Sequence, residues 1–344
     1  MVVLSHLGGT AIGAYAVFGF YILSGYLMTF IMHEDYGYTV FGVKKYALNR
    51  VLRIYPVYWA AMFISVLLIF YCGACSRVYC NAMYLPKDAF AWIRNLFLIL
   101  NPMRKPRFIP PAWSLSVELF FYICIGLGLS RSRKLAVAWF APSVMYHLII
   151  NILGMGYDYK YYFIPAASLP FSAGAVIYFF KKEIKTVEAM VFRFAKAEKG
   201  APFIVFFMVL YNFLIAGLTS RVHGFFFYTN FILQFLVVAS LVDRTGLPAI
   251  SRALDKKLGE LSYPVYLIHW PAGLAMIMFF RRMGISLHRG LLFFPLSVPF
   301  ILLAAWMLTR GIERPIEGLR QAVKKLRRAE AGEADAAANA ETCK

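Results

Sequence analysis

The chain has 344 residues, of which 61% are hydrophobic and 15% charged, and its mean hydropathy is +0.64. Soluble domains carry about a quarter charged residues, so this composition excludes an ordinary soluble protein and predicts a helical membrane protein. The formal charge of +19 would suit a nucleic-acid partner. The Lys and Arg residues lie between apolar segments and form no basic face, which argues against that partner.

Nine apolar stretches are long enough to cross a bilayer as α-helices. In chain order they are residues 11–32, 57–74, 112–130, 135–153, 161–180, 202–219, 224–242, 262–280 and 291–309. Charged or Gly/Pro-containing connectors separate them. We therefore predict an all-α, polytopic membrane bundle in which the lipid bilayer surrounds about nine complete spans.

The two ends of the chain differ from these spans. Residues 1–7 are apolar but much shorter than the roughly 20 residues that a crossing helix needs. We expect them to be the last part of a tenth span. Either translation starts at Met1 and this span is partial, or the true start lies upstream. Residues 319–328 are basic and amphipathic, and an Ala/Glu-rich segment follows. The predicted organisation is a transmembrane domain, 1–318, and a cytoplasmic tail, 319–344, whose last part is disordered.

The basic residues are distributed unevenly between the two sides of the predicted bundle. Because consecutive spans alternate sides, one face holds 25 of the 36 Lys and Arg residues. This face comprises 33–56, 131–134, 181–199, 244–257 and the chain from 310 onward. Loops rich in Lys and Arg stay in the cytoplasm, so we predict that this face and the C-terminus are cytoplasmic. We expect an integral protein of a bacterial inner membrane.

The longest external connector is 75–111. Its segment 92–100 is apolar but too short to span, so we expect an interfacial or re-entrant helix there. Cys72, Cys75 and Cys80 lie close together without the companion ligands of a zinc site, so no metal is predicted. Cys75 and Cys80 either form a disulfide in an oxidising compartment or remain free thiols.

Ionisable groups inside apolar spans are costly, so each is a candidate functional residue. His6 ends the partial first helix, Glu118 lies near the start of its span, and His269 lies about seven residues into another. A neutral imidazole takes a proton from a hydroxyl, and a carboxylate fixes its tautomer. We therefore predict that His6 and Glu118 share an outer cavity as general base and orienting group. The alternative is that both only satisfy neighbouring helices, the role that we assign to His147.

Arg50 and Arg53 are spaced i, i+3 and would project from the same side of a helix at the inner face. Guanidinium groups bind phosphate bidentately, so these residues are candidates for binding an anionic cytosolic donor such as a coenzyme A nucleotide. The alternative is a basic anchor next to a span.

Several motifs occur in one order along nearly the whole chain. They are V-V-L-S-H at 2–6, F-Y-I-L-S-G-Y-L at 20–27, R-V-L-R-I-Y-P at 50–56, W-S-L-S-V-E at 113–118 followed by F-Y at 121–122, S-Y-P-V-Y-L-I-H at 262–269 and E-R-P at 313–315. In this order they resemble the acyltransferase-3 family of membrane O-acyltransferases. One such motif alone would be a weak match, whereas the ordered set is specific.

The resemblance implies transfer of an acyl group, usually acetyl, from cytosolic acyl-CoA to a hydroxyl of an extracytoplasmic or lipid-linked glycan. Acyl-CoA is then a donor substrate, and no permanently bound cofactor is expected. His6 matches the family's proposed catalytic His, and we expect Glu118 to orient it. Arg50 and Arg53 would bind the donor. Further candidates for substrate or oxyanion contacts are Ser114, Ser116, Tyr122 and His269.

Two other functions remain open from the sequence. Intramembrane His and Glu also occur in transporters or flippases of lipid-linked or small hydrophobic substrates, although neither inverted repeats nor paired broken helices are visible. A catalytically inactive family member is the second alternative. The family's first helix carries an Arg eleven positions before its His, a position that would precede Met1 here.

Overall fold

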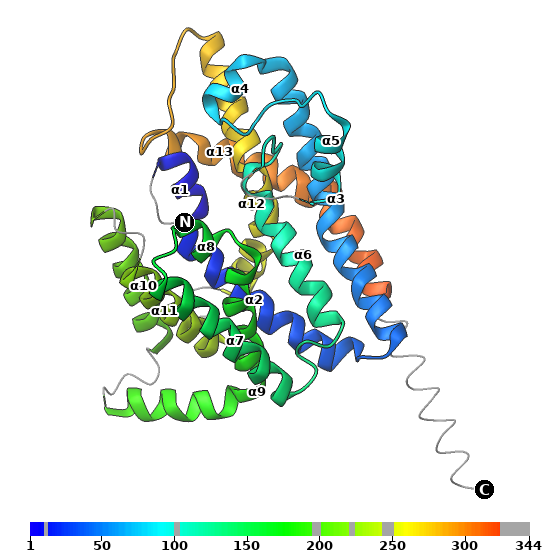
Figure 1. The fold of residues 1–344 in the computed structure, drawn as a ribbon. Coiled ribbons are helices and arrows are strands. Elements are labelled where there is room, and N and C mark those ends of the chain that lie inside the picture. The colour runs from blue at the N-terminus through cyan, green and yellow to red at the C-terminus, as the bar shows by residue number, and fades with distance from the viewer. Residues whose placement is uncertain (10–12, 100–103, 195–200, 220–223, 243–250, 324–344) are drawn as a thin grey trace, which may run out of the picture.

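Figure 1 shows the computed structural model, which describes residues 1–344 except 10–12, 100–103, 195–200, 220–223, 243–250 and 324–344. The described residues form an all-α fold without strands, as the sequence predicts. The helices are α1 (Val2–Gly8), α2 (Gly13–Ile31), α3 (Val40–Cys72), α4 (Ala74–Tyr79), α5 (Ala89–Leu96), α6 (Trp113–Gly126), α7 (Arg133–Ile152), α8 (Tyr157–Tyr161), α9 (Ile164–Phe194), α10 (Ala201–Thr219), α11 (Phe225–Leu241), α12 (Arg252–Arg282) and α13 (Phe293–Leu308). Short π or 3₁₀ segments occur at Met32–Tyr36, Pro110–Ala112 and Thr309–Glu313.

Six helices in the described part of the chain are long and apolar enough to cross a membrane, which makes the chain an integral membrane protein. They are Tyr15–Tyr36, Val40–Cys72, Arg133–Ile152, Tyr157–Val187, Arg252–Arg282 and Phe293–Val323. The predicted spans 112–130, 202–219 and 224–242 coincide with the shorter helices α6, α10 and α11. The structure therefore supports six long spans, and the count of nine stays a prediction.

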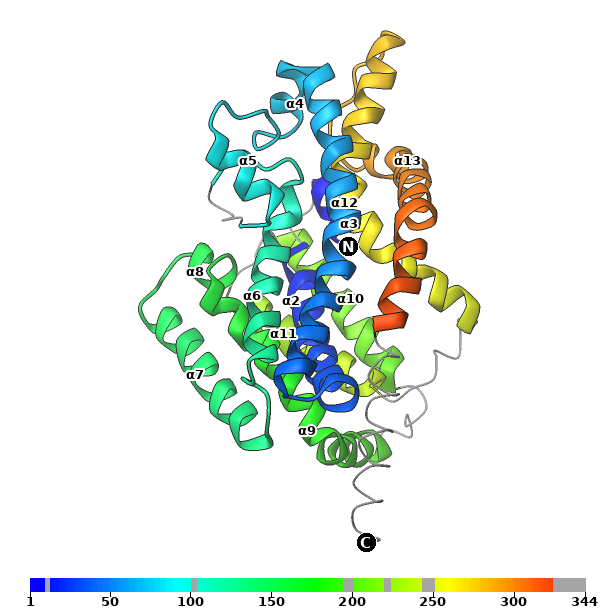
Figure 2. The same ribbon diagram turned by 90° about the vertical axis from the view of Figure 1, so that its right-hand side faces the viewer.

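Helices α2 and α9 cross at two glycines. A Cβ atom on Gly25 would clash with the carbonyl oxygen of Phe171, and one on Gly174 would clash with that of Ile22. Small residues allow backbones to touch inside a bilayer, where the hydrophobic effect does not drive helices together. This crossing fixes α2 within the bundle, where it also packs against α6 and α11 (Figures 1 and 2).

Helix α3 begins earlier than the sequence indicates. Thr39 caps its first turn by accepting a hydrogen bond from the Gly42 N–H, and the helix continues through Pro56 to Cys72. The expectation of a loop over 33–56 is therefore wrong for the residues from Val40 onward. Pro56 removes one backbone hydrogen bond but does not end the helix, because its neighbours pack against α6 and α12. The early start places Arg50 and Arg53 on a rigid element.

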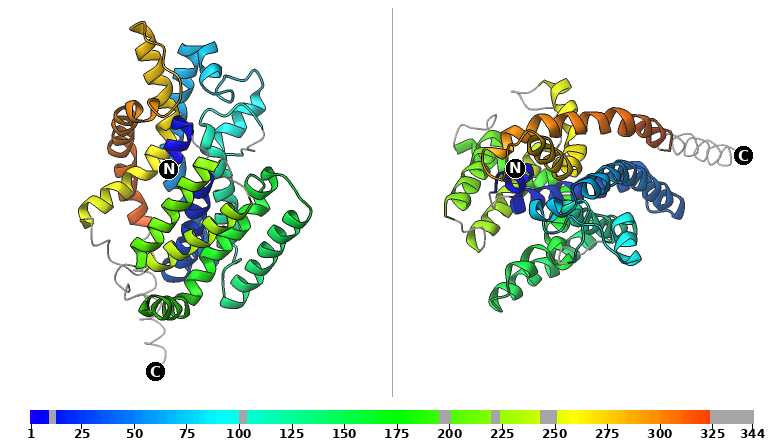
Figure 3. Two further views of the ribbon diagram at one scale, coloured as in Figure 1. Left: turned by 90° about the vertical axis from the view of Figure 1, so that its left-hand side faces the viewer. Right: turned by 90° about the horizontal axis from the view of Figure 1, so that it is seen from above.

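Helix α12 is similarly long and contains Pro264 and Pro271. It packs against α1, α3 and α13, and the view from above in Figure 3 places α12 and α13 on the opposite side of the bundle from α7. Gly273 lies so close to Tyr79 of α4 that a Cβ atom there would meet the tyrosine hydroxyl. Helix α12 therefore connects the bundle to the segment that contains α4 and α5.

Helix α9 bends at Phe180, whose backbone angles are not helical (φ −114°, ψ 18°). Its basic second half turns away from the direction of the first and runs along the lower edge in Figure 1. The sequence predicted a connector over 181–199, but the chain stays helical to Phe194. An amphipathic segment lying across one end of a bundle is typical of a helix at the membrane surface.

The connector between α3 and α6 contains the predicted short helix as α5. The helix begins at Ala89 rather than 92, because the Asp88 carboxylate accepts the Ala91 N–H and caps the first turn. Its C-terminal end binds α3: the Tyr58 hydroxyl donates to the Asn95 carbonyl at 2.5 Å.

The cysteine pairing differs from the alternatives that the sequence left open. Cys75 forms a disulfide with Cys72, and Cys80 is a buried free thiol. Cys75 sits at the start of α4, one helical turn beyond Cys72, which brings the two side chains together. The predicted tail after residue 323 lies outside the described residues.

Candidate functional site

Two histidines from distant parts of the chain meet in the bundle. The Nδ1 of His6 on α1 lies 2.9 Å from the Nε2 of His269 on α12, and the two rings stack with centroids 5.2 Å apart. His269 is fully buried. The sequence predicted that Glu118 orients His6, whereas the hydrogen bond of the His6 Nδ1 in the structure is to His269.

The hydrogen bonds determine where the protons of the neutral pair lie. The Nδ1 of His269 is 3.2 Å from the carbonyl oxygen of Val265, and since a carbonyl only accepts, this nitrogen carries the proton. The Nε2 of His269 then has a lone pair and accepts from Nδ1–H of His6. The Nε2 of His6 is consequently the unprotonated nitrogen, which is the form that a general base requires.

Arg289, in the connector between α12 and α13, holds the end of α1. Its Nη1 donates to the backbone carbonyl of His6 at 3.4 Å, and its guanidinium lies over the Trp270 ring at 5.0 Å. The N–H of Gly290 donates to the carbonyl of Leu7 at 3.0 Å. These contacts satisfy backbone groups at the C-terminal end of α1 and fix the position of His6.

A cavity of about 370 Å³ lies between α2, α3, α6 and α12, next to the histidine pair. Val2, one turn before His6, and Tyr266, three residues before His269, both line it. The Ser114 Oγ is 2.5 Å from the Tyr266 hydroxyl, which also donates to the Pro111 carbonyl at 2.9 Å. One wall of the cavity therefore carries hydroxyl groups close to His269.

Glu118 lines the same cavity but is held by hydroxyl groups. The Ser24 Oγ donates to its Oε1 at 3.0 Å, and the Tyr122 hydroxyl donates to the same oxygen. Glu118 is 3% exposed. The carboxylate is thus buried and hydrogen-bonded, as a charge inside a membrane protein must be.

Arg50 and Arg53 line the cavity from α3, as the i, i+3 spacing predicts, but their environments differ. Arg53 forms an ion pair with Glu313, and its guanidinium lies over the Tyr263 ring at 5.6 Å. The Nη2 of Arg50 donates to the Asn49 Oδ1 at 2.8 Å. Its Nε is buried and has no hydrogen-bond partner within the described structure.

A third arginine joins this end of the cavity. The Nε of Arg320 donates to the Asn49 Oδ1 at 3.3 Å, and the Asn49 Nδ2 donates back to the Arg320 carbonyl at 3.2 Å. Asn49 therefore connects Arg50 to Arg320. Arg320 lies in the stretch that the sequence predicted only as a basic amphipathic segment.

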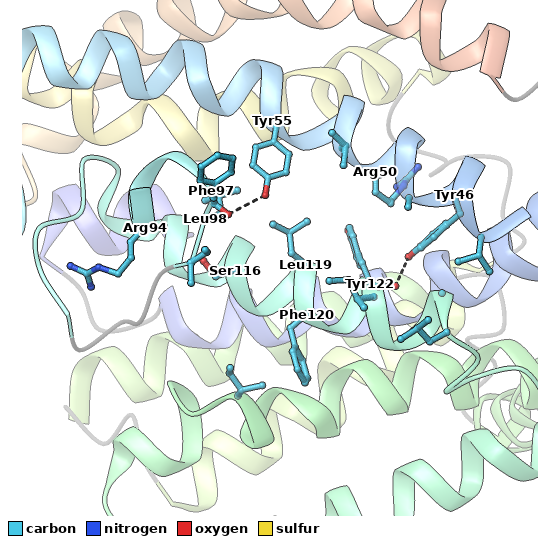
Figure 4. Close-up of a pocket in the computed structure, with 18 of the residues that line it drawn as sticks. Tyr46, Arg50, Tyr55, Arg94, Phe97, Leu98, Ser116, Leu119, Phe120 and Tyr122 are labelled. Carbon is cyan, nitrogen blue, oxygen red and sulfur yellow. Dashed lines mark hydrogen bonds between the residues drawn. The ribbon is translucent and has the colours of Figure 1, made fainter. Parts of the chain in front are cut away.

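The structure separates the remaining candidates. Ser114 lies on the face of α6 that lines the cavity, whereas Ser116 lines a groove on the other face (Figure 4). Tyr122 borders both spaces. His147 hydrogen-bonds to the Tyr228 hydroxyl and the Ala166 carbonyl, away from the His6 pair. No cluster of three or more His, Cys, Asp or Glu side chains in the described residues is placed to hold a metal.

Besides Arg320, sequence reasoning gave no role to Ser24, Tyr266 and Arg289. Ser24 and Tyr266 lie inside the motifs at 20–27 and 262–269, so their motif positions were an available signal. Arg289 carries no motif signal, since it is one basic residue in a short connector.

The comparisons with known proteins agree with this architecture. Residues 1–310 match the model of one protein family, which is described as an acyltransferase domain. Comparisons with curated proteins and with solved structures found no match. The match covers every residue that lines the cavity, both arginines of α3 among them, and also the two histidines beside it.

Proposed function

Because this chain belongs to the acyltransferase-3 family, we propose that it transfers an acetyl group from cytosolic acetyl-CoA to a hydroxyl of an extracytoplasmic or lipid-linked glycan. The observation that carries the proposal is the His6–His269 pair beside a cavity whose other residues include Arg50 and Arg53. The pair supplies a base, and the arginines supply positive charge for an anionic donor.

In the proposed reaction the acceptor hydroxyl lies at Nε2 of His6. His6 takes the hydroxyl proton as the oxygen attacks the thioester carbonyl, the carbon–sulfur bond breaks, and coenzyme A leaves as a thiolate that is then protonated. His269 acts as a positioning residue, because its Nε2 accepts the Nδ1–H of His6 and stabilises the imidazolium that forms.

The oxyanion of the tetrahedral intermediate needs a hydrogen-bond donor near the histidines. Ser114 is our candidate, since it lines the cavity and its hydroxyl contacts only neutral groups, the Tyr266 hydroxyl and the Pro111 carbonyl, from which it could turn to an oxyanion. Tyr122 has a single hydroxyl proton, which it donates to Glu118, and Ser116 faces the groove, so we leave both out of this role. Glu118 then serves to hold Ser24 and Tyr122 in place.

The donor would enter from the face that the positive-inside rule assigns to the cytoplasm. Arg50, Arg53 and Arg320 lie at this end, and we propose that they bind the phosphates of the coenzyme A moiety. The acceptor would reach His6 from the external side, near the connector 283–292. In this topology the C-terminus is cytoplasmic and the membrane is a bacterial inner membrane.

The test is transfer of labelled acetyl from acetyl-CoA to the glycan fraction by the purified protein in detergent, without an ion gradient. We expect H6Q to lower transfer about a thousandfold, the range of general-base loss. H147Q is the matched control, because His147 is also a buried intramembrane histidine with hydrogen bonds. It should retain transfer near the wild-type rate.

Two results would contradict the proposal. Full acetyl transfer by a folded H6Q variant would show that His6 is not the general base. Gradient-dependent movement of substrate without acetyl transfer by the wild-type protein would favour a transporter, and absence of both activities would favour a family member without catalysis.

A further inference from the structure

A groove of about 820 Å³ lies between α3, α5 and α6, on the face of α6 turned away from the cavity (Figure 4). This volume is typical of ligand sites. Its walls are largely apolar, with Phe97, Leu119 and Ile123 among the lining residues. None of the described residues that line it is an Asp or Glu.

The groove opens sideways. Phe120, Ile123 and Leu127 on its rim are 45%, 62% and 77% exposed. Side chains this apolar on the outside of a membrane bundle face lipid rather than water. A ligand in the groove would therefore enter from the bilayer.

Arginines without carboxylate partners line the groove. Arg94 is 8% exposed, its Nε is buried without a hydrogen-bond partner in the described structure, and Arg104 lines the groove with it. No ion pair among the described residues includes Arg94 or Arg104. Arg50 and Arg94 lie at opposite ends in Figure 4, with Leu119 between them. A buried cation is costly without a counter-charge, so this arrangement calls for an anionic ligand.

The Arg94 end of the groove has the character of a membrane interface. Helix α5 exposes Phe90 and Trp92, and its C-terminal end is fixed to α3, where the Trp59 Nε1 donates to the Leu96 carbonyl at 2.8 Å. Aromatic side chains of this kind gather at the level of lipid headgroups. Arg94 therefore lies where a lipid phosphate would be.

We propose that the groove binds an anionic glycerophospholipid, with its phosphate at Arg94 and Arg104 and a hydrocarbon chain along Leu119 and Ile123. Arginine binds phosphate bidentately, and the apolar walls match the chain. The site is separate from the proposed acyl transfer and does not depend on it. Arg50 and Tyr122 line both the groove and the cavity, so the bound lipid would adjoin the wall of the reaction site.

The experiment is native mass spectrometry of the full chain titrated with phosphatidylglycerol or phosphatidylcholine of identical acyl chains. We expect the wild-type protein to bind at least one phosphatidylglycerol about tenfold more tightly than phosphatidylcholine, and R94Q/R104Q to lose this preference. R281Q/R282Q is the charge-matched control, because these exposed arginines at the end of α12 do not line the groove. It should keep the preference.

A steric variant tests the same site if the double charge variant does not fold. Ile123 is exposed in the groove, so I123W should fold and reduce phosphatidylglycerol binding about tenfold by filling the space. Equal affinity of the wild-type protein for both lipids would overturn the proposal. An unchanged preference for phosphatidylglycerol in R94Q/R104Q, or unchanged phosphatidylglycerol binding in I123W, would overturn it as well. Tighter retention of a polyisoprenyl phosphate than of phosphatidylglycerol would overturn the assignment to a glycerophospholipid.

Discussion

The histidine end and the arginine end of the cavity are built in opposite ways. At the histidine end His6 and His269 share one hydrogen bond, and the tautomers leave a lone pair on His6. At the arginine end Arg53 pairs with Glu313, whereas Arg50 donates to the neutral amide of Asn49 and no ion pair of the described residues includes it. A positive charge without a carboxylate partner is suited to holding an anion, whereas an unprotonated nitrogen is suited to taking a proton. In our proposal the histidine end carries the chemistry and the arginine end binds the donor.

Apart from the loss of His6 itself, the largest expected effect comes from changing its partner. H269L removes the acceptor of the His6 Nδ1–H, so the imidazole loses its fixed tautomer and kcat should fall about a hundredfold. H269Q keeps an acceptor oxygen and should lose only about tenfold. Steady-state kinetics with acetyl-CoA distinguish the two. Equal losses in both variants would indicate a packing role for His269 and remove the contrast between the two ends.

Substitutions at the arginine end should change the KM for acetyl-CoA rather than kcat. R50Q removes charged hydrogen bonds to the donor, so KM for acetyl-CoA should rise about tenfold while kcat changes little. R133Q is a control, because Arg133 pairs with Glu183 on the exposed surface. A fall in kcat at unchanged KM would place Arg50 in the chemistry.

Breaking the Arg53 ion pair should mainly affect stability. R53Q leaves Glu313 without its cation, and we expect a loss of about 1–2 kcal/mol, limited by the partial exposure of Arg53. The double variant R53Q/E313Q replaces the charge pair by two amides and should recover most of that loss. Thermal unfolding in detergent measures the stability of each variant. A double variant less stable than R53Q would show that the broken Arg53–Glu313 ion pair does not cause the loss of stability.

The smallest effect is expected at Ser24. S24A leaves Glu118 with the hydrogen bond from the Tyr122 hydroxyl and should lower stability by about 1 kcal/mol with little change in transfer. Chemical unfolding and the transfer assay measure the two quantities. A loss of acetyl transfer comparable to that of H269L would indicate that Glu118 takes part in the reaction.

The order of motifs in the sequence predicted the family and the helical fold, and most of the residues that line the cavity lie within those motifs. It did not predict the partner of His6, because His269 is 263 residues away and only the packing of α1 against α12 brings them together. The apolar stretch 57–74 also did not show that α3 begins at Val40, because the first part of this helix carries basic residues and lies outside an apolar window. Glu118 lines the cavity together with Arg50 and Arg53, and a cavity shared with His6 stays a prediction. The partners of Glu118 were not predicted, because the contact with Ser24 depends on the approach of α2 to α6.

The central claim is that His269 holds His6 in the tautomer whose Nε2 is unprotonated. The most direct measurement is the ¹⁵N chemical shift of the two imidazole nitrogens of His6 in labelled protein in lipid nanodiscs, with H269L for comparison. The account predicts a protonated Nδ1 and an unprotonated Nε2 in the wild-type protein and a mixture of tautomers in H269L. A protonated Nε2 in the wild-type protein, or identical spectra in both, would contradict it.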